Sequence, residues 1–425
     1  TRSKKLSIKQ LFTYFKAALN SKDLDVTTGS IRKAIFMLSV PMILEMLMES
    51  IFALVDIIYV SQVSVNAVAT IGLTESVVTL VYAVAIGLSM AATAIVARRI
   101  GEKDTIGANQ AAVYLLGGNV TIMLLFLINA IFRGAGDASI AMWTLVLSNG
   151  LNIILDPIFI FGLGPIPAYG VEGAAIATNI GRGSAVLFQL GILFYGVGRL
   201  KIALKDLVIR TSVMLNLIKV SLGGIAQFLI GTSSWVFLIR IMSEFGSEVL
   251  AGYTIAIRVM MFTFMPSWGM SNAAATLVGQ NLGANKPERA EKSVWITGKY
   301  NAIFMVIVSL VYLIFAKEIL RWFSSEAEVI QYGALCLQVI AAGYVFYAYG
   351  MVVIQSFNGA GDTKTPTYIN FVCFWLFQIP IAYLMALTFE MGPLGVFLAI
   401  VFAEALIAVI GIILFRRGRW KSVKV

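Results

Sequence analysis

The chain has 425 residues, of which 59% are hydrophobic and only 13% charged; its net charge is +10 and its mean hydropathy is +0.88. This composition excludes a soluble protein, because long apolar stretches without charge are typical of segments that span a bilayer. Both cysteines lie in apolar runs and there is no histidine, so the sequence predicts neither a disulfide framework nor histidine-based proton transfer. Any proton chemistry must depend on carboxylates.

Residues 1–33 are basic and mildly amphipathic, with neither a long apolar core nor a cleavage site of small residues. They therefore do not form a signal peptide. We predict a cytoplasmic segment that is solvated or lies among the lipid headgroups.

The next stretch, PMILEMLMESIFALVDIIYV at 41–60, carries three carboxylates, Glu45, Glu49 and Asp56, within a run of membrane length. At about 100° per residue, all three lie on one face of a helix. Carboxylates at bilayer depth are unfavourable unless they face a cavity or a partner, so this face indicates a pathway. Glu45, which is close to Pro41, either lines a water-exposed vestibule or takes part in ion coupling. Glu49 either lines the cavity or takes part in ion coupling.

Apolar spans continue along the whole chain, and the linkers between them differ in charge. Seven basic segments hold 25 of the 32 Lys and Arg residues, so the positive-inside rule places them in the cytoplasm together with both termini. These segments are 1–33, 97–104, 133–139, 198–210, 283–293, 359–366 and 415–425. The predicted spans are 34–60, 66–97, 106–128, 139–163, 170–197, 213–242, 249–281, 293–316, 327–357, 366–389 and 394–415.

An internal repeat relates the two halves of the chain. GLSMAATAIVARRIG at 87–101 resembles GMSNAAATLVGQNLG at 269–283, an offset of 182, and FRGAGDASIAM at 132–142 resembles FNGAGDTKTPT at 357–367, an offset of 225. The second half thus holds about 43 residues that the first half lacks near 128–129. Since one apolar stretch separates two basic linkers there, the parity of the crossings also predicts that most of a helix and a loop of helices 3–4 are missing.

With that segment restored, the sequence predicts an all-α polytopic membrane protein of twelve transmembrane helices in two six-helix lobes. An even number of helices per half makes the repeats parallel, related by a pseudo-twofold axis along the membrane normal, with a substrate cavity between the lobes. The predicted divisions are a cytoplasmic N-terminal segment (1–33), the N-lobe (34–197), an inter-lobe cytoplasmic linker (198–212), the C-lobe (213–415) and a cytoplasmic tail (416–425).

A second polar group lies inside the fifth predicted helix of the complete fold. Asn152 and Asp156 are four residues apart and share a face, so their oxygens can meet one ion. Pro157 has no N–H, which leaves the Ile153 carbonyl free as another possible ligand. The alternative is that Asp156 only caps a broken helix end.

Several motifs, in this order, resemble the multidrug and toxic compound extrusion (MATE) family, and most closely its prokaryotic branches. They are FALVDIIYV at 52–60, LDPIFIFGLGPIPAYGVEGAAIATNIGR at 155–182, AAATLVGQNLGANKPERA at 273–290 and the repeated GAGD loops. The resemblance runs from about residue 31 to 415. It implies a V-shaped pair of lobes in a prokaryotic plasma (inner) membrane, and export of cationic, amphipathic compounds in exchange for H⁺ or Na⁺ by alternating access.

The resemblance also implies a coupling site. Asp56 matches the family's acidic position on the first helix, although Phe52 stands where several members have a tyrosine. Thr178 adds a hydroxyl beside Asn152 and Asp156. Several oxygens suit Na⁺, and two close carboxylates can equally share a proton, so the coupling ion stays open between H⁺ and Na⁺. No other cofactor is expected.

Other intramembrane residues are less specific. Glu75 is a further candidate cavity acid, and Arg182 is a candidate counter-ion to one of the acids. In the second half, Glu404 either forms a structural ion pair with Arg258 or Lys299 or takes part in transport. Because Met adapts its shape and aromatic faces attract cations, the candidate residues lining the substrate cavity are Met260, Met261, Phe264 and Trp268.

Two alternatives remain for the function. A lipid-linked saccharide flippase of the same superfamily tends to need a cationic cavity, whereas this first lobe is acidic. An intramembrane aspartyl protease is a remote alternative, because the GAGD segments at 134–137 and 359–362 fit its motif but lie in predicted cytoplasmic loops. The sequence has no phosphate-binding loop for ATP. We expect no enzyme activity, no nucleic-acid partner and a functional monomer.

Overall fold

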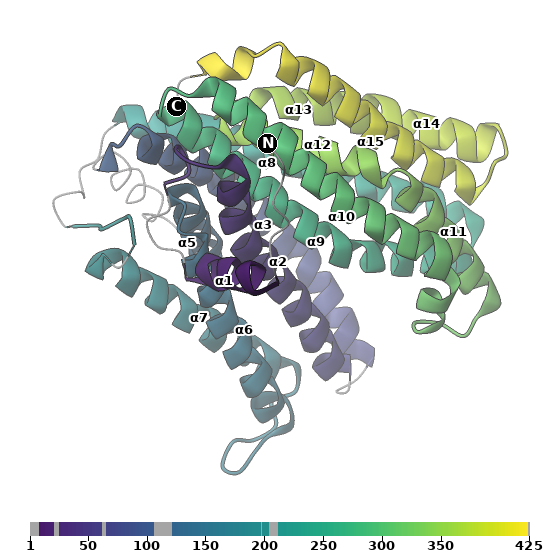
Figure 1. Cartoon of the computed structure of the whole chain (residues 1–425). Coiled ribbons are helices and arrows are strands. Elements are labelled where there is room, and N and C mark those ends of the chain that lie inside the picture. The colour runs from purple at the N-terminus through teal and green to yellow at the C-terminus, as the bar shows by residue number, and fades with distance from the viewer. Residues whose placement is uncertain are drawn as a thin grey trace.

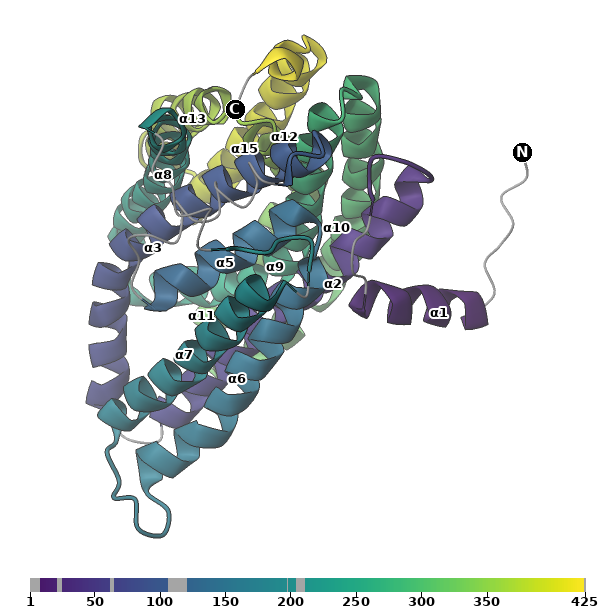
Figure 2. The ribbon, with the colours of Figure 1, turned by 90° about the vertical axis from the view of Figure 1, so that its left-hand side faces the viewer.

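The computed structural model describes residues 8–20, 25–61, 65–105, 121–196, 198–203 and 211–423. Apart from one isolated bridge between Leu163 and Ile166, all regular structure in these ranges is helical. The reason lies in the apolar runs, because a chain in lipid must satisfy its backbone hydrogen bonds within each segment. In Figures 1 and 2, α6 and α7 lie side by side at one end of the helical assembly, and α13 and α15 lie at the other.

The helices of each half follow the predicted spans closely. The first half contains α1 (Ile8–Leu19), α2 (Ile31–Ser61), α3 (Val65–Gly101), α5 (Thr121–Ala135), α6 (Ala138–Phe161) and α7 (Val171–Tyr195). The second half contains α8 (Thr211–Met242), η2 (Ser243–Phe245), α9 (Ser247–Gly283), α10 (Pro287–Arg321), α11 (Ala327–Ala342), α12 (Tyr344–Gly359), α13 (Lys364–Asn370), η3 (Phe371–Gln378), α14 (Ile379–Tyr383), η4 (Leu384–Thr388), α15 (Pro393–Arg416) and η5 (Arg419–Ser422).

The prediction of a polytopic helical membrane protein is confirmed. Within the described ranges, eight helices are long and apolar enough to cross a membrane, and α11 with α12, bent by 59°, would form a ninth span. The predicted span 106–128 lies partly outside the described residues. Its described part belongs to α5, which continues past the predicted end to Ala135.

Two equivalent pairs of side chains make the internal repeat visible in the structure. In the first half, Glu45 of α2 forms an ion pair with Arg133 of α5. In the second half, Gln227 of α8 and Asn358 of α12 form two amide hydrogen bonds of 2.9 and 3.2 Å. Gln227 follows Glu45 by the first repeat offset and Asn358 follows Arg133 by the second. The same helix pair is therefore joined at the same place in both halves, by charges in one and by neutral amides in the other.

The two halves meet through small residues close to the basic linkers. A Cβ on Gly101 of α3, inside the basic segment 97–104, would collide with the carbonyl oxygen of Gln280 on α9, so glycine is what permits this close approach. Thr276 of α9 donates a hydrogen bond of 3.1 Å to the backbone carbonyl of Arg133 on α5. The halves are thus packed together on the side predicted to face the cytoplasm.

The N-terminal residues 25–29 also join the halves. Arg289 of α10 donates hydrogen bonds of 2.7–3.1 Å to the backbone carbonyls of Val26, Thr28 and Gly29. The Val26 side chain is fully buried in a cluster that contains residues of α2, α6 and α9. Val26 is therefore packed onto the helices, whereas Asp25, Thr28 and Gly29 stay exposed. The assignment of residues 1–33 to a cytoplasmic segment stays a prediction.

The orientation in the membrane stays a prediction with a direct test. Cysteines placed in the linkers 243–248 or 388–395 should react with impermeant thiol reagents added outside cells, because these linkers carry little positive charge. A cysteine at 283–290 should react only after the membrane is made permeable. The reverse labelling pattern would overturn the assignment of the basic linkers to the cytoplasm.

A second test concerns the length of the first half. Between α9 and α13 the second half has three helices, whereas α5, of 15 residues, is the described helix between α3 and α6. We predict that the natural protein carries about 43 further residues between about 126 and 131, which complete its fourth helix. Its intact mass should then clearly exceed 46.2 kDa. A mass equal to that value would contradict both the repeat offsets and the parity of the crossings.

Candidate functional site

The centre of the candidate site is a buried polar pair on α6. Asp156 is fully buried and Asn152 is 2% exposed, and the Asn152 amide Nδ2 donates a hydrogen bond of 3.1 Å to Asp156 Oδ1. Pro157 lies inside a helix that continues to Phe161. Asp156 therefore does not cap a broken helix end, and that alternative is wrong. The Ile153 carbonyl lacks its usual amide partner because residue 157 is proline.

Thr178 brings α7 into the same group. Its hydroxyl oxygen accepts a hydrogen bond of 3.2 Å from Asn152 Nδ2, so one amide links an oxygen from each helix. The helices approach closely because residue 181 is glycine. A Cβ there would lie 2.7 Å from the carbonyl oxygen of Ser148 on α6. The three predicted ligands Asn152, Asp156 and Thr178 are thus brought together by one close helix crossing.

Arg182 lies one turn beyond Thr178 on α7 and has a carboxylate partner on α2. Its Nη2 lies 3.7 Å from Glu49 Oε2, and its guanidinium lies 5.0 Å from the centre of the Phe52 ring. Arg182 is 5% exposed. The sequence predicted a counter-ion without choosing its acid, and the structure identifies that acid as Glu49. Phe52, at the position where a tyrosine was expected, offers the face of its ring to this cation.

The side chain of Asp56 lies outside the described residues, although its backbone belongs to α2. Its neighbours fix where this part of α2 runs. Phe52 contacts Arg182 of α7, and the ring of Tyr59 lies 6.3 Å from that of Phe161 on α6. The turn of α2 that carries Asp56 therefore lies between a contact with α7, made by Phe52, and a contact with α6, made by Tyr59. The side chain of Glu75 on α3 also lies outside the described residues.

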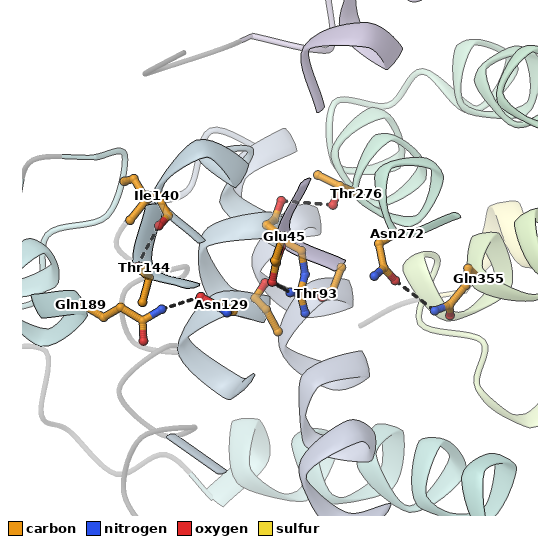
Figure 3. A network of polar contacts seen from close by, with 11 residues as sticks. Glu45, Thr93, Asn129, Ile140, Thr144, Gln189, Asn272, Thr276 and Gln355 are labelled. Carbon is orange, nitrogen blue, oxygen red and sulfur yellow. Dashed lines mark hydrogen bonds and ion pairs between the residues drawn. The ribbon is translucent and has the colours of Figure 1, made fainter. Parts of the chain in front are cut away.

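Glu45 has an environment that the sequence did not predict. It is 1% exposed and forms an ion pair with Arg133, which is itself 7% exposed. Figure 3 shows Glu45 within a network of polar contacts. A water-exposed vestibule for Glu45 is therefore wrong for this structure. Arg133 was placed in a cytoplasmic linker, but α5 extends through it and carries its side chain inward. The internal repeat is the feature of the sequence that could have identified Arg133 as a buried residue. It aligns Arg133 with Asn358, which is hydrogen-bonded to the buried Gln227.

In the second half, Glu404 of α15 does not pair with either predicted cation. Arg258 and Lys299 are exposed, and neither forms an ion pair with Glu404. Glu404 is half-buried on α15. The structural ion pair expected for Glu404 is therefore wrong. The long aliphatic parts of Arg258 and Lys299 allow their charged groups to lie at the protein surface and not between the helices.

The four candidate residues for a substrate cavity have different surroundings. Met260 is 1% exposed and belongs to the core of the second half, whereas Met261 is exposed and Trp268 is half-buried. Phe264 stacks on Tyr347, with ring centres 5.0 Å apart and planes at 26°. The structure does not bring the four together into one surface, although Phe264 joins an aromatic cluster with Tyr344 and Tyr347.

The first half therefore holds two kinds of carboxylate. Glu45 and Glu49 each have an arginine partner, so the charges of these pairs compensate. Asp156 belongs to a group of oxygens linked through the Asn152 amide, which also contacts the Thr178 hydroxyl, and the Ile153 carbonyl lies one turn earlier on the same helix. Such a set suits a small hard cation, and a second nearby carboxylate would suit a shared proton.

Comparison with known proteins gives consistent matches. A family model described as MatE matches residues 41–128 and 224–384, and its first stretch ends where the repeat predicts missing residues. The chain is similar to a probable multidrug resistance protein NorM of Thermotoga maritima, with 26% identity over 442 residues that cover 92% of this chain and 94% of the relative. Since 442 exceeds the whole length of 425, the relative contains positions without a counterpart here.

Solved structures match over nearly the whole chain. One is a multidrug resistance MATE family transporter in an outward-facing conformation, with a TM-score of 0.85 and 26% identity over 95% of this chain and 99% of the other. Another is a MOP superfamily transporter from Pyrococcus furiosus with a binding pocket of reversed polarity, with a TM-score of 0.85 and 26% identity over 96% and 98% of the two chains.

Proposed function

The chain belongs to the MatE family of MATE transporters, and we propose that it exports cationic, amphipathic small molecules in exchange for H⁺ or Na⁺ by alternating access. The observation that carries this proposal is the buried cluster of Asp156, Asn152 and Thr178 inside the first half. The similarity to proteins described as multidrug resistance and multidrug export proteins supports the class of substrate.

The proposed coupling step depends on the cost of a buried carboxylate. Asp56 and Asp156 bind the coupling ion, because a carboxylate in the membrane interior is unfavourable unless it is protonated or bound to a cation. Ion binding drives a conformational change only if the ion binds the two lobe arrangements with different affinity. Helices α2 and α6 are suited to such a change because each contains a proline, Pro41 and Pro157, that removes a backbone hydrogen bond.

The two arginine pairs have a different role in this proposal. Glu49 is paired with Arg182 next to Thr178, so it needs no coupling ion for its charge to be compensated. We assign to this pair the positioning of α7 against α2 and modulation of the neighbouring coupling site. Glu45 and Arg133 similarly hold α2 against α5 close to the contact with α9.

The packing of the lobes suits one state of an alternating-access cycle. The halves are in contact beside the basic linkers, which suits a state whose cavity opens away from the cytoplasm. We propose that the protein works as a monomer in a prokaryotic plasma membrane, with both termini in the cytoplasm.

Export of a fluorescent organic cation from proteoliposomes tests this proposal. A proton gradient and a sodium gradient are imposed separately, and one of them should drive transport of the cation well above the rate without a gradient. If neither gradient drives the cation, antiport of this class of substrate is excluded. Gradient-driven movement of an anionic lipid-linked saccharide instead would favour the flippase alternative.

A further inference from the structure

A cavity of about 310 Å³ lies outside the candidate coupling site, between α12, α13 with η3, and α15. Its apolar part is formed by Ile369, Val372, Ile410 and Leu414. At one end it is bordered by Arg417 and Arg419, which follow α15, and by Asp362, which precedes α13. The cavity therefore joins an apolar interior to a charged rim beside two linkers that are predicted to be cytoplasmic.

The internal repeat shows that the rim of this cavity differs between the halves. GRLK at 198–201 follows α7, the last helix of the first half, and the similar GRWK at 418–421 follows α15, the last long helix of the second half; the third residue of each, Leu200 or Trp420, is fully buried. In the first half, Arg199 donates from its backbone N–H to Asp137 Oδ2 (2.8 Å) and from its guanidinium to the Ala135 carbonyl (3.2 Å). These bonds fix Arg199 over the end of α5.

The equivalent residues of the second half do not make these contacts. Asp362, the counterpart of Asp137, accepts hydrogen bonds from the backbone N–H and the hydroxyl of Thr365, at 3.2 and 2.6 Å. Arg417 and Arg419 are both exposed, and their guanidinium groups form no ion pair within the described part of the chain. Two arginines therefore border the cavity without such contacts, whereas Arg199 of the first half is hydrogen-bonded to its own half of the protein.

The cavity also adjoins the surface that faces lipid. Val372 in its wall is 42% exposed, Tyr368 beside it is 69% exposed, and Ile413 on the same face of α15 as Ile410 is 49% exposed. In a membrane protein, exposed apolar side chains of spanning helices contact acyl chains. A lipid molecule can therefore reach the apolar wall without entering water.

We propose that this cavity binds a glycerophospholipid whose phosphate lies between Arg417 and Arg419 and whose acyl chain lies along Ile369, Val372 and Ile410. Charge complementarity carries the proposal, since two arginines and one aspartate leave one positive charge for one phosphodiester. Basic pockets between spanning helices on the cytoplasmic side are suited to lipid headgroups. The binding site is separate from the proposed coupling site and does not depend on transport activity.

Native mass spectrometry of the delipidated full chain, titrated with phosphatidylglycerol, tests this site. We expect Arg417→Ala/Arg419→Ala to weaken phosphatidylglycerol binding by about tenfold, the effect of losing charge-assisted hydrogen bonds to one phosphate. Ile410→Trp, which fills the cavity and leaves both arginines, should weaken binding to a similar extent. A matched control is Arg240→Ala/Arg321→Ala, which removes two exposed arginines elsewhere and should leave binding unchanged.

Two further ligands separate the parts of the proposal. Diacylglycerol with the same chains should bind about tenfold more weakly than phosphatidylglycerol, because it lacks the phosphate. Inorganic phosphate at millimolar concentration should not displace the lipid, because it lacks the acyl chain. The proposal is wrong if the Arg417/Arg419 variant binds phosphatidylglycerol as the control does, if diacylglycerol binds equally well, or if inorganic phosphate displaces the lipid.

Discussion

Asp156→Asn is expected to reduce gradient-driven export by at least about tenfold while the protein still folds and enters the membrane. The amide has nearly the shape of the carboxyl group, so Asn152 can still contact residue 156, but the site loses the charge that binds H⁺ or Na⁺. If the ion no longer binds, an ion gradient cannot favour one lobe arrangement over the other, because it acts only through the ion's different affinity for the two arrangements. Initial rates of export from proteoliposomes, at equal amounts of reconstituted protein, measure the effect.

Glu244→Gln is the matched control for this substitution. Glu244 is an exposed acid in the second half that pairs with Arg240 four residues earlier, so its loss should leave export near the parent rate. Asp56→Asn should behave as Asp156→Asn does. If Asp156→Asn exports the cation against a gradient as well as the parent protein, the assignment of coupling to this aspartate is wrong.

Arg133→Asn is expected to destabilise the folded protein by about 3–5 kcal/mol, because it leaves the carboxylate of Glu45 buried without its partner. The second half of the chain supplies the compensating change. Glu45→Gln/Arg133→Asn would reproduce the amide pair of Gln227 and Asn358 at the equivalent position, and should recover most of the lost stability. Thermal unfolding in detergent compares the parent, the single variant and the double variant.

The reciprocal exchange controls for local packing. Asn358→Arg alone would introduce a cation opposite Gln227 and should destabilise the protein, whereas Gln227→Glu/Asn358→Arg should be more stable than that single variant. If Glu45→Gln/Arg133→Asn is no more stable than Arg133→Asn alone, the two sites are not equivalent. The two halves would then share their backbone arrangement but not the equivalence of these two side-chain pairs.

The sequence predicted the helical membrane fold and the family, because apolar runs, basic linkers and ordered motifs are local properties. The family model confirmed the resemblance. The grouping of Asn152 with Asp156 followed from helical spacing, and Thr178 followed from the family resemblance; the structure places all three together. Their role in ion coupling stays a proposal.

Partners across helices could not be predicted from spacing. Glu45 and Glu49 lie on the same face of α2. Glu45 pairs with Arg133 and Glu49 with Arg182 because of where α5 and α7 lie along α2, which the sequence does not show. Arg133 was misplaced because a charged residue at the end of an apolar run looks like the start of a linker. The burial of Val26 was not predicted because it depends on contacts with α2, α6 and α9, which local sequence does not reveal.

Ion movement during substrate export tests the central proposal most directly. Parent and Asp156→Asn proteins are reconstituted with a pH-sensitive dye or a sodium indicator inside the liposomes, and the organic cation is added to start exchange. We predict that the parent protein moves one of these ions in the direction opposite to the substrate, and that the Asp156→Asn protein shows no such ion flux. Equal substrate-dependent ion flux in the two proteins would contradict coupling through Asp156.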